Sequence, residues 1–126
     1  MGNIHSVTKS LKSLGEEIIL IKNYHQTKDC KALILPGVGA FDPAINNLIN
    51  TDLIIDIKNW INSGKSFLGI CLGLQLLFES SEEGSINGLG ILTGTIKRIP
   101  QLSDQRIPHV GWCELCLLYT SDAADE

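Results

Sequence analysis

The sequence lacks a long apolar segment and a cluster of basic residues. No apolar run among its 126 residues reaches the ~18 that a membrane-spanning helix requires. Lys97-Arg98 is the only adjacent basic pair and the net charge is −4, so nothing favours nucleic-acid binding. Residues 1–5 lack the basic start and apolar stretch of a secretory signal peptide. We expect a cytoplasmic protein that binds neither a membrane nor nucleic acid.

The sequence also lacks the cysteine spacing of a metal site or a disulfide framework. Its cysteines are Cys30, Cys71, Cys113 and Cys116, and only the last two lie close together. No second close pair and no matching histidine pair accompanies them. We therefore expect free thiols, as in cytosolic proteins, with no metal and no cofactor.

Apolar segments of strand length alternate with helical patterns, and glycine lies at their junctions. This order favours a single α/β domain with a mostly parallel sheet covered by helices. The expected strands are residues 17–21, 32–35, 66–70 and 90–96. Helices are expected over residues 4–14, after Asp42 and after Thr51 as N-terminal caps, and over residues 72–78.

The sharpest local signal is Gly-Ile-Cys-Leu-Gly at residues 69–73, between an expected strand and an expected helix. This arrangement is typical of the nucleophile elbow of α/β hydrolytic folds. The turn exposes the nucleophile at the sheet edge, and glycines on either side avoid collisions there. Cys71 is the predicted nucleophile, and the N–H of Leu72 can hold an oxyanion. The alternative is a buried cysteine at an ordinary strand–helix joint.

Two further features fit a binding site but also have plain structural readings. Gly37, Val38 and Gly39 follow an expected strand, and their backbone amides could approach a carbonyl as an oxyanion hole or binding loop. An ordinary glycine-rich turn explains them equally well. Gln75 lies one helical turn after Cys71 and could bind a polar substrate, or find a backbone partner within an apolar helix.

A cysteine nucleophile needs a base, usually a histidine oriented by a carboxylate. His5 lies on the first expected helix and His25 in a polar segment, which favours solvent exposure for both. His109 has only Glu114 as a nearby carboxylate in the sequence. The residues alone therefore show no convincing triad.

Longer motifs carry a resemblance to a known family. They are residues 2–7 (GNIHSV), 35–41 (LPGVGAF), 69–79 (GICLGLQLLFE), 81–84 (SEEG), 88–90 (GLG) and 107–112 (IPHVGW). Over residues 2 to 115 the chain resembles the glutaminase subunits of imidazole glycerol phosphate synthase, the histidine-pathway members of the class I glutamine amidotransferases. The elbow is shared by the whole class, whereas the PGVGAF, SEEG and PHVGW segments together indicate this subunit.

The resemblance implies a flavodoxin-like α/β fold and the hydrolysis of L-glutamine to glutamate and ammonia. By this likeness Cys71 would form a glutamyl thioester. The loop of residues 37–39 would match the family's oxyanion strand, and Leu72 its second oxyanion donor. Gln75 would match a residue near the bound glutamine.

The resemblance also implies a heterodimer with a cyclase subunit that has a (β/α)8 barrel. There the ammonia would react with a phosphoribulosyl formimino ribonucleotide, giving imidazole glycerol phosphate and aminoimidazole carboxamide ribotide. The segment with Pro108, His109, Gly111 and Trp112 is similar to the family's stretch near this partner. An interface role is therefore preferred to a catalytic one for these residues.

The chain departs from the family pattern at both ends. The family has a strand before Gly2, and its catalytic His and Glu follow in a C-terminal section, so residues 1–115 are expected to form an incomplete domain without activity. Cys113 stands where the family usually has Asn, and residues 116–126 are expected to be an unrelated, disordered tail.

Two other functions fit part of the pattern. One is a non-catalytic module that docks on the cyclase, although such a module has no need of an intact elbow. The other is a different class I amidotransferase subunit, such as that of the anthranilate or pyridoxal-phosphate pathway, against which the family-specific segments argue.

Overall fold

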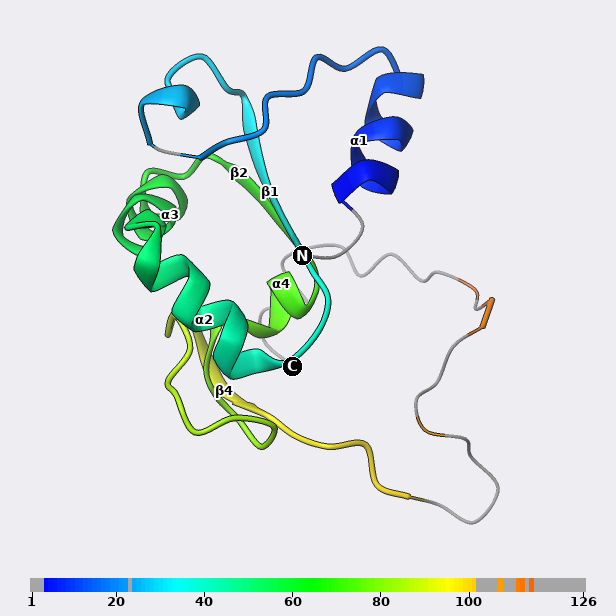
Figure 1. Cartoon of the computed structure of the whole chain (residues 1–126), viewed down its shortest axis with the longest axis vertical. Helices are drawn as coiled ribbons and strands as arrows, with labels where there is room; N and C mark the ends of the chain where they lie inside the picture. The colour runs from blue at the N-terminus through cyan, green and yellow to red at the C-terminus, as the bar shows by residue number, and fades with distance from the viewer. Residues whose placement is uncertain (1–3, 23, 102–106, 108–110, 113, 115–126) are drawn as a thin grey trace.

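The chain is an α/β protein, as expected from its sequence (Figure 1). A computed structural model describes residues 4–22, 24–101, 107, 111–112 and 114. Its elements in chain order are α1 (Ile4–Ser13), the 3-10 helix η1 (Tyr24–Thr27), β1 (Ala32–Gly37), α2 (Phe41–Asn50), α3 (Leu53–Asn62), β2 (Ser66–Cys71), α4 (Leu72–Gln75), β3 (Phe78–Ser81) and β4 (Leu92–Ile96). None of the helices in these ranges is long and apolar enough to cross a membrane.

Strands β1 and β2 pair in parallel and run side by side (Figure 1). Their register starts at Ala32 opposite Ser66 and ends at Gly37 opposite Cys71. Parallel strands need a long crossover, which α2 and α3 provide here. Strands β3 and β4 form a second parallel pair. The ends of β1 and β2 thus meet at one edge of the sheet.

The hydrophobic core lies between the β1–β2 pair and the helices α2, α3 and α4. Helices α2 and α3 lie together on one side of these strands (Figure 1). The buried cluster consists of Phe41, Ile45, Leu48, Ile57, Leu72, Leu76, Leu77 and Leu89. Trp60 is also buried, and its indole N–H donates to the carbonyl oxygen of Ser66 at 3.0 Å. This bond joins α3 to the start of β2.

The strand expected at residues 17–21 is wrong, because the segment belongs to no helix or strand of the described structure. Ile19 and Leu20 are 47% and 58% exposed. A strand needs a hydrogen-bonded neighbour, and no described strand pairs with this segment. Apolar β-branched composition alone was therefore a misleading signal.

The two expected helix caps are also wrong. Helix α2 begins at Phe41 with Ala40 as its N-cap, so Asp42 lies within its first turn. Helix α3 has Asp52 as its N-cap. The hydroxyl of Thr51 instead donates to the carbonyl oxygen of Asn47 at 2.9 Å, at the end of α2.

The helix expected over residues 72–78 is a single turn, α4. Beyond it the carbonyl of Leu76 accepts a hydrogen bond from the N–H of Leu89 at 2.8 Å. The carbonyl of Leu77 accepts from the N–H groups of Ile91 and Leu92, at 2.8 and 2.9 Å. These carbonyls are therefore bonded to a distant segment, and the chain turns into β3 at Phe78.

Candidate active site

Cys71 is held in the geometry of a nucleophile elbow. It ends β2 and is the N-cap of α4, with φ 54° and ψ −116°. Few non-glycine residues adopt a positive φ, and such strain often marks a functional position. Its side chain is exposed, with a free thiol. The buried-cysteine alternative is therefore excluded.

The glycines on either side of Cys71 are sterically required, as the motif predicted. A Cβ on Gly69 would lie 2.7 Å from Cα and 2.8 Å from N of Leu74. A Cβ on Gly73 would overlap the carbonyl oxygen of Leu35. These neighbours are backbone atoms that cannot rotate aside, so α4 packs on the strands only because both positions lack side chains.

The glycine loop that follows β1 begins beside this turn. A Cβ on Gly37 would lie 3.1 Å from the backbone N of Gly73 and 3.1 Å from Cβ of Leu72. Val38 is 55% exposed, and Gly39 has φ 105° with nothing within 4 Å of its Cβ position. Glycine at residue 37 thus allows the loop to lie close to Leu72 and Gly73, and glycine at residue 39 allows the positive φ. The loop therefore begins next to the turn that holds Cys71.

Leu72 and Gln75 are the first and last residues of α4. The side chain of Leu72 is 3% exposed in the core, which fixes the backbone next to Cys71. The first N–H groups of a helix have no acceptor within it, so they can bind a ligand oxygen. Gln75 is half-buried one turn along. The structure therefore brings Cys71, Gly37, Leu72 and Gln75 into one region.

Sequence reasoning missed the role of Asp42. Its carboxylate accepts hydrogen bonds from the N–H of Ser85 at 3.0 Å to each oxygen, from the Ser85 hydroxyl at 3.0 Å and from the N–H of Ile86 at 3.1 Å. The backbone bonds from Ser85 and Ile86 lower the pKa of Asp42 below its ordinary value of 3.8. An aspartate before proline favoured a helix cap, and nothing in the pattern indicated a partner so far along the chain.

No described side chain hydrogen-bonds to the thiol of Cys71, so a general base is not identified among them. His5 is exposed on α1. The side chains of His25 and His109 lie outside the described residues, as do Pro108 and residues 115–126. Of the expected interface residues, Gly111 and Trp112 are described, and both are exposed.

The chain matches the family model described as glutamine amidotransferase class-I over residues 1–113. It belongs to this family. Membership agrees with the cysteine elbow and the parallel strands described above, and it confirms the resemblance drawn from the motifs.

Relatives from Prochlorococcus marinus and Synechococcus carry the name imidazole glycerol phosphate synthase subunit HisH. That of Prochlorococcus marinus subsp. pastoris is 86% identical over 115 residues, which are 91% of this chain and 56% of the relative. That of Prochlorococcus marinus strain MIT 9312 is 80% identical over the same shares. That of Synechococcus sp. strain CC9902 is 52% identical over 97% of this chain and 60% of the relative. The chain thus spans a little over half the length of these relatives.

Proposed function

We propose that this chain is the glutaminase part of an imidazole glycerol phosphate synthase and acts in histidine biosynthesis. The carrying observation is the exposed thiol of Cys71, held at φ 54° at the end of β2 with Gly37 opposite it in the sheet. Family membership and the relatives' names support the substrate, L-glutamine. The proposed location is the cytoplasm.

The proposed reaction begins when the thiolate of Cys71 attacks the side-chain carboxamide carbon of glutamine. A C–S bond forms and the carbonyl oxygen becomes an oxyanion. Its collapse breaks the C–N bond, and the nitrogen leaves as ammonia after taking up the proton that the thiol lost. Water then hydrolyses the thioester, releasing glutamate and restoring the thiol.

The surroundings of Cys71 suit this chemistry. Backbone N–H groups of Leu72 and of the Gly37–Gly39 loop are proposed to bind the oxyanion, since donors fixed in advance stabilise developing charge most effectively. The buried side chain of Leu72 holds one of them in place. Gln75 is proposed to hydrogen-bond the bound glutamine.

The ammonia is proposed to pass to a cyclase subunit with a (β/α)8 barrel, within a heterodimer. The cyclase would combine it with a phosphoribulosyl formimino ribonucleotide, giving imidazole glycerol phosphate and aminoimidazole carboxamide ribotide. The proposed contact includes Pro108, His109, Gly111 and Trp112. Trp112 is fully exposed in this chain, which suits an aromatic side chain that a partner would cover.

Active-site labelling tests this proposal. The chain, with its cyclase present, is treated with a chloroketone analogue of glutamine, and peptide mass spectrometry locates the adduct. We expect saturable labelling of Cys71 that L-glutamine slows and that Cys71→Ala abolishes. Cys30, whose thiol donates to the Gln26 carbonyl at 3.5 Å, is the matched control. Equal, unsaturable labelling of Cys30 and Cys71 would refute the proposal.

A non-catalytic module that docks on the cyclase remains the second candidate, favoured only by the lack of a described base beside Cys71. Saturable labelling of Cys71 would distinguish a glutaminase from a docking module, which has no glutamine site.

A further inference from the structure

The carboxylate of Asp42 joins two segments that are 43 residues apart in the sequence. On one side is the first turn of α2, and on the other the turn of residues 82–86 that follows β3. Ser85 donates its N–H to both carboxylate oxygens and its hydroxyl to one of them. Ile86 adds a second backbone N–H. Both oxygens are therefore engaged by one short segment.

This contact lies on the helix that follows the glycine loop next to Cys71. Gly37 ends β1 opposite Cys71, and α2 begins after the loop that leaves Gly37. The five residues from Gly37 to Asp42 span at most about 18 Å. In parallel α/β sheets, ligands bind at the carboxyl ends of the strands. The turn of residues 82–86 is thus held against the first turn of the helix that follows this edge.

The start of the turn is bonded to β4 and the residues after it, whereas its end is bonded to α2. The N–H of Glu82 donates to the Ile96 carbonyl at 2.9 Å, and its carboxylate accepts from the Arg98 N–H at 2.8 Å. Helix α2 buries Phe41, Ile45 and Leu48 in the core. In the turn, Glu82, Glu83 and Ser85 are exposed, and Ile86 is half-buried against the core. Helix α2 is therefore the fixed body, and Asp42 holds the turn to it.

Gly84 shows independently that the turn is shaped around this carboxylate. A Cβ on Gly84 would overlap Oδ1 of Asp42 and lie 3.0 Å from its Cγ. It would also lie 3.0 Å from Cδ1 of Phe41, which is fully buried. The turn approaches α2 so closely that a side chain at residue 84 would displace the carboxylate of Asp42.

We propose that Asp42 is a positioning residue that fixes the turn of residues 82–86 as a wall of the proposed glutamine site at Cys71. Its carboxylate touches no reacting atom in this scheme and acts through the turn that it holds. The inference rests on the proposed function, because the wall matters only if a glutamine-like ligand binds beside Cys71. Loss of the carboxylate then weakens ligand binding more than it alters the thiol.

The test compares Asp42→Ala and Asp42→Asn with Asp56→Asn as the matched control. Asp56 is likewise in the first turn of a helix, α3. Ser85→Ala is an intermediate variant, because it removes the hydroxyl donor and keeps the backbone donors. Two readouts are taken on the chain with its cyclase: amide hydrogen exchange of residues 82–86, and alkylation of Cys71 by the glutamine chloroketone and by iodoacetamide.

For Asp42→Ala we expect roughly tenfold faster exchange at the amides of Ser85 and Ile86, which lose their acceptor, since local opening is limited by such bonds. We expect the chloroketone concentration for half-maximal labelling to rise roughly tenfold, with an unchanged iodoacetamide rate at Cys71. Asp42→Asn should fall between Asp42→Ala and the parent chain, and Asp56→Asn should match the parent chain.

Unchanged amide exchange in Asp42→Ala would show that Asp42 does not hold the turn of residues 82–86, whatever the labelling shows. Faster exchange with an unchanged chloroketone concentration for half-maximal labelling would overturn the positioning role. Asp42 would then only stabilise the fold. Absence of saturable labelling in the parent chain would refute the glutaminase proposal and with it the positioning role. Exchange alone would still decide whether Asp42 holds the turn, so the two failures remain distinguishable.

Discussion

Gly37 and Cys71 face each other at the last position of the parallel β1–β2 ladder. The backbone of Gly37 also approaches the first residues of α4, where a Cβ would lie 3.1 Å from the N of Gly73. The glycine loop and the reactive thiol therefore leave the sheet side by side. This relationship makes the glycines around Cys71 a test of the site's architecture.

Gly73→Ala should strongly destabilise the chain. The added methyl group would overlap the carbonyl oxygen of Leu35, which is fixed in β1. We expect a loss of about 3 kcal/mol in the free energy of unfolding, measured by urea denaturation. Gly111→Ala is the control, because nothing lies within 4 Å of its Cβ position. A Gly73→Ala chain as stable as this control would contradict the packing of α4 on β1.

Replacing Cys71 should reveal backbone strain at the elbow. Alanine cannot easily adopt φ 54°, whereas glycine can, so Cys71→Gly should be more stable than Cys71→Ala by about 1 kcal/mol. At most other positions, a glycine variant is normally less stable than the alanine variant. Thermal melts of both variants measure the difference, and Cys30→Gly against Cys30→Ala is the reference pair. A Cys71→Ala chain more stable than the Cys71→Gly chain would show that the backbone at residue 71 is unstrained.

Asp42 should make stability depend on pH in the acid range. Its pKa is lowered by the hydrogen bonds from Ser85 and Ile86, so the folded state favours the carboxylate. The stabilisation is complete above the unfolded value of 3.8 and is lost as pH falls through the lower folded pKa. Melting temperatures of the parent chain and Asp42→Asn should therefore differ near pH 6 and converge towards pH 2. A constant difference across this range would contradict the assignment.

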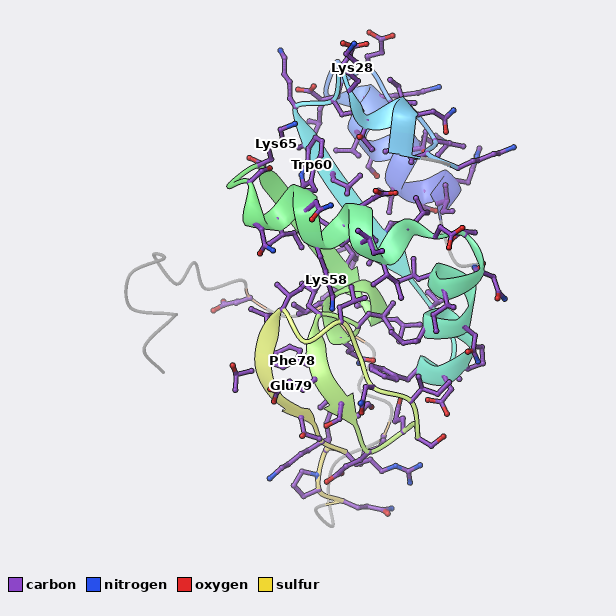
Figure 2. All side chains as sticks on the ribbon, turned by 90° about the vertical axis from the view of Figure 1, so that its left-hand side faces the viewer. Lys28, Lys58, Trp60, Lys65, Phe78 and Glu79 are labelled. Atoms are coloured by element: carbon purple, nitrogen blue, oxygen red, sulfur yellow. The ribbon has the colours of Figure 1, made fainter. Side chains whose placement is uncertain are left out.

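Substitution by phenylalanine should lower the stability of the chain at Trp60 but not at Trp112. Trp60 is 3% exposed, and its indole N–H donates to the Ser66 carbonyl. The Lys65 ammonium lies 4.4 Å from the centroid of the Trp60 ring, and both side chains are labelled in Figure 2. Trp60→Phe loses this hydrogen bond and should cost about 1 kcal/mol in urea unfolding. Trp112 is fully exposed, so Trp112→Phe should leave stability unchanged. Equal effects of the two changes would contradict the packing of α3.

Several features were predictable because their causes are local in sequence. A strand followed by Gly-X-Cys-X-Gly and an apolar helix is typical of a tight turn, so this pattern alone predicted the turn at Cys71. The strands near residues 32 and 66 were found because short apolar runs between glycine-rich turns pair readily. The identity of the family followed from the same motifs.

Errors arose where a residue's partner is distant in sequence. The segment 17–21 has the composition of a strand and no described strand beside it. The helix after Cys71 stops at Gln75 because carbonyls beyond it bond to residues 89–92. Asp42 was interpreted as a cap, although its carboxylate reaches Ser85 and Ile86.

The sequence by itself determined the α/β class and the family, and it singled out the residue proposed as the nucleophile. These depend on short patterns of side-chain size and backbone freedom, which act between neighbours. Only the tertiary structure decided where α4 ends, which carboxylate holds the turn of residues 82–86 and how closely Gly37 approaches Gly73. Those outcomes depend on hydrogen bonds and contacts between segments that come together only when the chain has folded.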